Sequence, residues 1–381
     1  MTPERSARYE TLLRQLEQDG RRRSLARRSG IDFTSNDYLG LAESPRLNAA
    51  VIAALERGVP IGAGGSRLLR GNHPEHEALE AEAAAFFGAE RMLYFGSGYA
   101  ANVAILSTLP QRGDIVVHDA LIHASAHAGI AAGRANAVAV PHNDVGAFDD
   151  AIANWRKAGG TGHPWIAVES LYSMDGDTAP LAELLELADR HDGFLLVDEA
   201  HATGVHGADG RGLTAGLEGR DNVVVLHTCG KALGTSGALV SSSRVLGDFL
   251  VNRARPFIYA TAPSPLAAAS VRQALNILAD EPERREKLQH LIAFANQQAA
   301  DRLGIDGSGS QILPVIIGDN ERTLRIAERM QAEGFDIRAI RPPTVPAGTA
   351  RLRVAITLNV DPPTIARMFD RLAHAIAAES P

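Results

Sequence analysis

The sequence has very little cysteine and no long apolar run. Of its 381 residues only Cys229 is a cysteine, which excludes an internal disulfide and a cysteine-based zinc cluster. No apolar stretch approaches the roughly 18 residues that a membrane-spanning helix needs. The N-terminal residues MTPERSARYE are polar and are not followed by the apolar stretch of a signal peptide. We therefore expect a soluble cytoplasmic protein with no membrane partner.

Positive charge is also in short supply. The chain has 45 acidic residues against 38 lysines and arginines, which gives a formal net charge of −7. Proteins that bind nucleic acid normally show a basic surface and a high isoelectric point, so we expect no nucleic-acid partner. Hydrophobic residues make up 45% and charged residues 22%, as in ordinary globular proteins. This composition excludes disordered, collagen-like and coiled-coil chains.

Lysine is the scarcest charged residue. The only lysines are Lys157, Lys231 and Lys287, because nearly all basic residues are arginine. Lys157 and Lys287 stand in charged helical stretches, where a lysine is normally a surface residue. Lys231 instead follows an apolar run and lies among small residues. A partly desolvated lysine has a lowered pKa and can form a Schiff base, so Lys231 is a candidate nucleophile.

The middle of the chain alternates between short apolar runs and helical stretches such as Leu181–Arg190. The runs are Arg91–Phe95, Ile115–His118, Trp165–Glu169, Phe194–Val197 and Val223–Leu226. Such runs, separated by helices, are typical of a mainly parallel sheet that is buried on both faces. The sequence therefore predicts an α/β fold whose large domain has three layers.

The two ends of the chain have a different sequence pattern. Before the large domain we expect a charged helix from Pro3 to about Gln18 and then a basic cluster, Arg21–Arg28, of the kind that usually forms a solvated face. After about Ser264, long helical stretches and few strands predict a smaller α+β domain. The predicted division is an N-terminal segment (1–45), a large α/β domain (46–280) and a small α+β domain (281–381).

Candidate ligand-binding residues follow the strands, because open parallel sheets bind ligands beyond the carboxyl ends of their strands. A glycine turn, Gly96–Tyr99, enters a helix after the first run and suits a phosphate, although it could be a plain tight turn. Asp198 ends another run and could be a site carboxylate, a helix cap or a metal ligand. His123 and His127 lie four residues apart, as two metal ligands on one helix face could, but the motif HExxH is absent. His123 could equally be an aromatic side chain that stacks on a ligand.

These parts match what pyridoxal 5′-phosphate needs from a protein. Its phosphate needs an anion site, its aldehyde needs a lysine, and its ring nitrogen needs an acidic partner. The glycine turn, Lys231 and Asp198 supply one of each, and we expect no metal.

Six segments carry a resemblance to a known family. They are SNDYLGL (35–41), GAGGSRLLRGNHPEHEALE (62–80), HASAHAG (123–129), SMDGDTAPL (173–181), DEAHATG (198–204) and HTCGKALG (227–234). The chain resembles the α-oxoamine synthases, which are pyridoxal-phosphate enzymes of fold type I with an aspartate-aminotransferase-like fold. The resemblance covers almost the whole chain from about Phe33 onwards.

The resemblance implies a role for each candidate residue. Lys231 would hold the cofactor, and Asp198 would pair with its ring nitrogen. His201 would contact the phenolic oxygen, and His123 would stack on the ring and meet the substrate. The implied phosphate contacts are Gly98, Tyr99, Ser173, Thr228 and, across a dimer interface, Thr261. The implied substrate contacts are Arg21, Thr344 and Arg353.

The sequence offers an alternative to each of the two arginines that the resemblance implies. Arg22 or Arg23 could replace Arg21 after a slip of one or two residues. In ARLRVAIT (350–357), alternation places Arg351 and Arg353 on one strand face, where both could simply be solvated. A guanidinium suits a carboxylate, and only the family position favours Arg353.

The resemblance also implies the reaction and its partners. Segment 340–357 and YSMDGDTAPL favour the members of the family that join L-alanine to a pimeloyl group carried by coenzyme A or acyl carrier protein, as a homodimer. The alternatives are a sister enzyme that uses glycine and another acyl-CoA, an ordinary aminotransferase, and a non-catalytic α/β binding protein.

Overall fold

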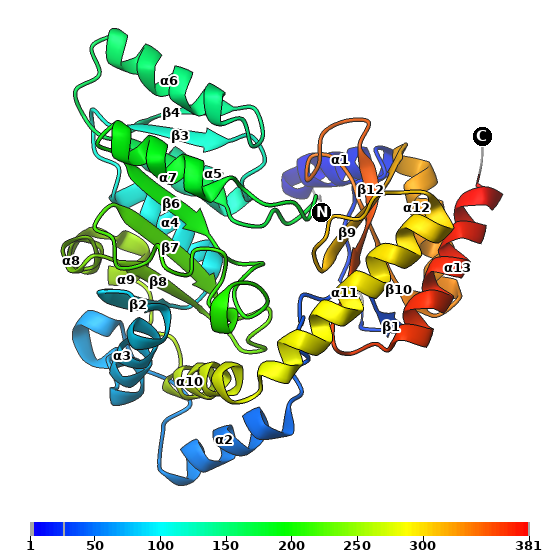
Figure 1. Cartoon of the computed structure of the whole chain (residues 1–381), viewed down its shortest axis with the longest axis horizontal. Coiled ribbons are helices and arrows are strands. Elements are labelled where there is room, and N and C mark those ends of the chain that lie inside the picture. The colour runs from blue at the N-terminus through cyan, green and yellow to red at the C-terminus, as the bar shows by residue number, and fades with distance from the viewer. Residues whose placement is uncertain (1–3, 26, 380–381) are drawn as a thin grey trace. The chain divides into compact units, whose positions relative to one another are not determined.

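The computed structural model describes residues 4–25 and 27–379 (Figure 1). Pro3, where we expected the first helix to begin, lies outside these residues. The chain divides into a larger unit, 36–173 with 177–289, and a smaller unit, 1–35 with 174–176 and 290–381. Each unit is described by itself below. The three-part division expected from the sequence stays a prediction.

The larger unit is built on a seven-stranded sheet in the order β2-β8-β7-β6-β5-β3-β4. Neighbours from β7 to β4 pair in parallel, whereas β8 runs antiparallel to β2 and β7. The strands are β2 (Arg91–Phe95), β3 (Ile115–Asp119), β4 (Asn136–Val140), β5 (Pro164–Glu169), β6 (Phe194–Asp198), β7 (Val223–Thr228) and β8 (Ala238–Ser242). This confirms the predicted, mostly parallel sheet and its five predicted strands.

Helices lie before, between and after these strands. They are α2 (Pro45–Glu56), α3 (Pro74–Phe87), α4 (Gly98–Thr108), α5 (Ala124–Ala132), α6 (Val145–Lys157), α7 (Leu181–Arg190), α8 (Arg244–Arg253), α9 (Arg255–Ile258), α10 (Pro265–Asp280) and the start of α11 (Pro282–Leu303). In α3, residues at the two ends of the helix determine where it begins and ends. Pro74 begins it, where a missing N–H costs little, and Gly88 ends it in the left-handed conformation at φ +79°.

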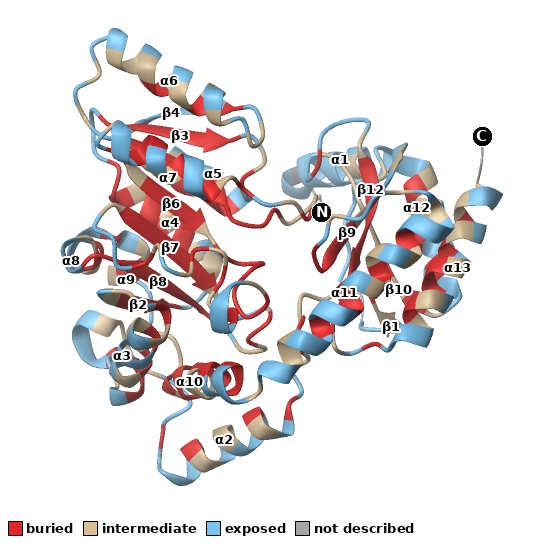
Figure 2. Ribbon diagram, viewed as in Figure 1, coloured by how far each residue is buried: buried red, intermediate tan, exposed pale blue. Residues whose placement is uncertain are grey.

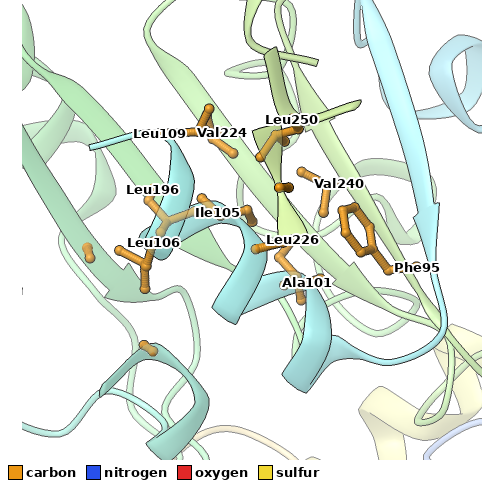
Figure 3. Packing of buried hydrophobic residues seen from close by; sticks show 14 of the residues in the cluster. Phe95, Ala101, Ile105, Leu106, Leu109, Leu196, Val224, Leu226, Val240 and Leu250 are labelled. Carbon is orange, nitrogen blue, oxygen red and sulfur yellow. The ribbon is translucent and has the colours of Figure 1, made fainter. Parts of the chain in front are cut away.

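Two hydrophobic cores cover the two faces of the sheet. Leu196 and Val224 point into a core with α4 and α8, which Figure 3 shows around Ile105 and Leu250. Their chain neighbours, such as Leu195, point to the opposite face, where α6 and α7 pack. Figure 2 shows the sheet strands mostly buried and the outer faces of α6 and α7 exposed. The predicted three-layer arrangement is therefore confirmed.

The smaller unit contains an antiparallel sheet in the order β11-β12-β9 and a parallel pair, β1-β10. Its elements are α1 (Glu4–Gln18), β1 (Ile31–Asp32), the rest of α11, β9 (Ile312–Gly318), α12 (Asn320–Ala332), β10 (Phe335–Asp336), β11 (Arg338–Ile340), β12 (Ala350–Ala355) and α13 (Pro362–Ala378). The predicted strand that includes β12 ends earlier than expected. Beyond it, the Thr357 hydroxyl accepts the Asn359 N–H at 3.2 Å in a local turn.

Candidate active site

Three parallel strands of the larger unit end in polar residues on one side of the sheet. Glu169 ends β5 directly beside Asp198 at the end of β6, and β7 ends at Thr228. Asp198 lies two residues after Leu196 in β6, and side chains two residues apart in a strand point to the same face. Leu196 faces α4, so the Asp198 side chain points to the α4 side as well. Lys231 follows Thr228 by three residues. This sheet edge therefore gathers an amine and two carboxyl groups.

Lys231 is tied to His201 by a short contact. Its Nζ lies 2.7 Å from Nε2 of His201, and Nδ1 of the same ring lies 2.7 Å from the hydroxyl of Tyr38. The Tyr38 hydroxyl donates to Oδ1 of Asn36 at 3.0 Å, so it accepts its other hydrogen bond from Nδ1–H of His201. The Nε2 atom is then left to accept a hydrogen bond from the Lys231 amine.

Asp198 is held as a hydrogen-bond acceptor. Its Oδ2 accepts the side-chain N–H of Asn102 from α4 at 2.7 Å, and its Oδ1 accepts the backbone N–H of Ala200 at 3.0 Å. Asn102 is buried and also donates to the Ser125 hydroxyl at 3.0 Å. Because both carboxylate oxygens have donors, the negative charge on Asp198 is fixed in place.

His123 caps α5 next to this group. Its Nδ1 accepts the backbone N–H of Ser125 at 3.2 Å, which leaves Nε2 to carry the proton of a neutral ring. Desolvation lowers the pKa of His123, and the charge of Lys231 lowers it further, whereas Asp198 opposes the change. A neutral imidazole is the form that suits flat packing against an aromatic ring.

The predicted anion site falls at the N-terminus of α4. The Ser97 hydroxyl accepts the Ala100 N–H at 3.2 Å, so the N–H groups of Gly98 and Tyr99 precede the first intrahelical bonds. A Cβ on Gly98 would lie 2.7 Å from the Thr228 methyl carbon. Only glycine fits at this position without a shift of the neighbouring atoms. Gly98 and Thr228, both predicted phosphate contacts, are therefore neighbours in space.

The other predicted phosphate contacts lie at different places in the larger unit. The Ser173 N–H donates to Oε2 of Glu169 at 3.2 Å, so Ser173 sits at the end of β5. The Thr228 hydroxyl donates to the Ala200 carbonyl at 3.2 Å. Thr261 is exposed on the loop after α9. The structure thus groups Ser173 and Thr228 with the site and leaves Thr261 on the surface.

Of the substrate-binding candidates, His123 lies in the larger unit, whereas Arg21, Thr344 and Arg353 belong to the smaller unit. Arg21 and Thr344 line a groove of about 640 Å³ together with Arg22, Arg23 and Arg341. Both alternatives to Arg21 therefore line the same groove. Burial of the Arg341 guanidinium and the charge of Arg23 lower the pKa of Arg341. A groove with this charge suits an anionic group.

The two arginines of β12 differ in their surroundings. Both are buried, which contradicts the idea of a solvated pair. Arg351 forms an ion pair with Asp175 and donates to the carbonyls of Met174 and Thr349, at 3.2 and 3.0 Å. Arg351 is thus committed to a structural role.

Four site residues had no role assigned from the sequence. They are Tyr38, Asn102, Ser125 and Glu169. Tyr38 lies in the segment SNDYLGL, which carried the resemblance. Glu169 ends an apolar strand just as Asp198 does, so the pattern that found Asp198 could have found it too. The described residues 4–25 and 27–379 contain no cluster of His, Cys, Asp and Glu suited to a metal ion and no helix able to cross a membrane.

The sequence matches a family model described as aminotransferase class I and II over residues 28–372. Among curated relatives, 8-amino-7-oxononanoate synthase of Chromobacterium violaceum is 43% identical over 87% of this chain and 85% of its own. The synthase of the same name from Anaeromyxobacter dehalogenans is 44% identical over 93% of this chain and 87% of its own. These relatives cover nearly all of the described fold.

Solved structures of a serine palmitoyltransferase and of an 8-amino-7-oxononanoate synthase are also similar to this chain. A serine palmitoyltransferase of S. paucimobilis, solved with a bound adduct of pyridoxal phosphate and myriocin, matches with a TM-score of 0.89 and 28% identity over 98% of both chains. An 8-amino-7-oxononanoate synthase of Francisella tularensis matches with a TM-score of 0.76 and 26% identity, over 92% of this chain and 99% of its own. The expected aspartate-aminotransferase-like fold is confirmed.

Proposed function

Because the chain belongs to the class I and II aminotransferases and, within them, to the 8-amino-7-oxononanoate synthases, we propose that it condenses L-alanine with a pimeloyl thioester. The products are 8-amino-7-oxononanoate, CO2 and the free thiol, in biotin biosynthesis. The observation that carries the proposal is the 2.7 Å contact between Lys231 and His201 beside the fixed carboxylate of Asp198. The cytoplasmic location expected from the sequence stays a prediction.

The residues of the larger unit fit pyridoxal 5′-phosphate as the cofactor. Lys231 supplies the amine for its aldehyde, and Asp198 supplies the charge for its ring nitrogen. Gly98 and Tyr99 offer backbone N–H groups for its phosphate, at a point where a Cβ on Gly98 would crowd the neighbouring threonine. When bound, the cofactor stabilises negative charge on the α-carbon of an amino acid.

The protein residues then handle protons and charge. Lys231 takes the proton from the α-carbon of alanine, and Nε2 of His201 lies 2.7 Å from that amine, within hydrogen-bonding distance. A carbon–carbon bond forms between the α-carbon and the thioester carbonyl, and the thiol leaves. Loss of the alanine carboxyl as CO2 follows, and Lys231 returns a proton to the same carbon. Asp198 holds its charge through both carbanionic steps.

Besides His123 of the larger unit, we assign the substrate contacts to residues of the smaller unit. Arg353 is proposed to bind the alanine carboxylate because the family position favours it, and Arg351 is paired with Asp175. Arg21 and Thr344 are proposed to contact the acyl substrate in the arginine-lined groove. The groove offers positive charge for an anionic acyl donor. Both coenzyme A and acyl carrier protein fit that description.

A homodimer is proposed from an exposed apolar face of the larger unit. Large side chains that stand exposed there are Ile61 (73%), Leu69 (87%) and Tyr259 (75%). The Ala262 N–H donates to the Gly65 carbonyl at 2.9 Å, so the segments that carry these side chains lie side by side. Contiguous exposed apolar residues of this kind mark protein interfaces. Thr261 lies on this face, where a partner subunit would use it.

The apolar face gives a direct prediction for the assembly state. Leu69→Asp places a charge in the proposed interface and should convert a dimer into particles of single-chain mass, as measured by sedimentation. The matched change Ile52→Asp, at an exposed position on α2, should leave the dimer intact. A wild-type protein that sediments as a single chain at micromolar concentration would refute the proposal.

The proposed reaction is tested by crossing amino acids with acyl thioesters. We expect CO2 and thiol release only when L-alanine is combined with pimeloyl-CoA or pimeloyl-acyl carrier protein, and the two arms compare the carriers. Glycine and serine, with acetyl-, succinyl- or palmitoyl-CoA, should be turned over at least about tenfold more slowly. Preference for glycine and a shorter acyl group would instead identify a sister α-oxoamine synthase with the same catalytic residues.

A further inference from the structure

Glu169 is a buried acid that none of the roles above uses. It is 3% exposed, ends β5, and is the direct neighbour of Asp198 in the sheet. Residues in register on adjacent parallel strands point to the same side, so both carboxyl groups face α4 and α5. A small cavity lined by His123, Asn102, Asp198 and Glu169 separates these side chains.

The two oxygens of Glu169 have different surroundings. Oε2 accepts the backbone N–H of Ser173 at 3.2 Å. Oε1 is fully buried and has no hydrogen-bond partner among residues 4–25 and 27–379. A buried carboxylate oxygen without a donor is costly, whereas a protonated oxygen costs far less. The contacts therefore favour a proton on Oε1.

Asp198 and Glu169 cannot both be ionised without repulsion at such neighbouring positions. Asp198 has two donors, Asn102 and Ala200, and so is the better place for the charge. Burial, followed by the charge of Asp198, raises the pKa of Glu169 to about 8, while Lys231 and the N–H groups of Ser173 and His123 oppose the rise. Two neighbouring acids are thus driven into different protonation states.

We propose that Glu169 is a positioning residue that works as a neutral carboxylic acid. It holds the Ser173 segment at the end of β5, where that segment can reach the cofactor phosphate. By staying neutral, it leaves Asp198 to carry the negative charge beneath the ring. The inference rests on the proposed use of pyridoxal 5′-phosphate and adds a residue to its site.

The first test measures cofactor affinity at pH 7 by absorbance titration of the full-length protein. Glu169→Gln keeps the shape and the neutral state, so its dissociation constant should stay within about threefold of wild type. Glu169→Ala removes the acceptor for the Ser173 N–H and should weaken binding about tenfold or more. Glu199→Gln is the matched control, because Glu199 is equally buried but accepts the Thr214 N–H instead, at 2.6 Å. Its affinity should not change.

The affinity results separate the proposal from its rivals. If Glu169→Gln binds as weakly as Glu169→Ala, the ionised form is the one required and the proposal is wrong. Unchanged binding in Glu169→Ala would equally overturn it, because no segment would then depend on Glu169. Neither measurement involves an acyl substrate, so a wrong assignment of the acyl group leaves the test intact.

The second test uses the unfolding temperature of the cofactor-free, full-length protein. A carboxyl whose pKa is about 8 when folded and 4.5 in its ordinary state makes stability fall as pH rises between those values. Glu169→Gln lacks this loss, so its advantage in Tm over wild type should grow by about 2 °C or more across that window and then level off. The groups that face Glu169 are Asp198 on β6, Lys231 after β7, His123 before α5 and Tyr172 after β5, and all are the same in both proteins.

A difference in Tm that stays flat from pH 5 to about pH 9 would show that Glu169 is ionised throughout, which contradicts the proposal. This readout needs no cofactor. If the wild-type protein failed to bind pyridoxal 5′-phosphate, the proposed function would fall, while the protonation state of Glu169 would still be decided.

Discussion

Replacement of Lys231 by alanine should abolish turnover and covalent retention of the cofactor. Lys231 is the amine at the end of β7 and the group placed to move the proton at the α-carbon, 2.7 Å from His201. Loss of a positioned proton-transfer group alone costs about 10²–10⁴-fold in rate, and loss of the covalent attachment adds to this. Turnover should therefore fall below detection in the assay of CO2 release.

The same variant should lose the borohydride-reducible chromophore on the protein, which can be followed by absorbance and by the mass of the intact chain. Lys157→Ala is the matched control, because Lys157 is exposed on α6, and it should keep both chromophore and activity. A Lys231→Ala protein that still carried a reducible chromophore would show that another lysine anchors the cofactor.

The sequence predicted those site residues whose place follows from the strand directly before them. Lys231 and Asp198 each follow an apolar strand, and parallel strands end at a common edge, so their neighbourhood could be inferred without coordinates. The scarcity of lysine made the choice of Lys231 sharper. The tight turn into α4 was predicted for the same reason, since one segment contains both the strand and the helix.

The residues that support them were harder to predict, because their partners lie far away in the sequence. Asn102 donates to a carboxylate 96 positions later, and Tyr38 bonds to a histidine 163 positions later. No pattern within one segment specifies such a pairing. β4 and β8 were also missed. β4 is a largely exposed strand with alanine and asparagine, so it lacks the apolar run that identified the others.

The choice between Arg351 and Arg353 shows what contacts add to periodicity. Alternation along β12 places both on one face and treats them as equivalent. The structure separates them, because the ion pair with Asp175 occupies Arg351. The family position is still what favours Arg353, and the ion pair shows the role that Arg351 has instead.

Replacement of Asp198 by asparagine should reduce turnover by about 10²–10³-fold or more while the fold remains intact, because it removes a preorganised charge that two carbanionic steps require. Asparagine keeps an oxygen that can accept the Ala200 N–H, which Asp198 now accepts at 3.0 Å. The amide of Asn102 can turn to present its oxygen to the new N–H group. Tm should therefore change little, and the loss should appear in kcat.

Asp198→Asn can be told apart from general damage to the site. Asp150→Asn, at an exposed position on α6, is the matched control and should keep wild-type kcat. Asn102→Ala removes one of the donors to Asp198 but leaves its charge, so its loss of activity should be smaller than that of Asp198→Asn. Near-normal turnover of Asp198→Asn would contradict the role of this carboxylate. The negative charge would then have to be supplied by Glu169, which would also refute its assignment as a neutral acid.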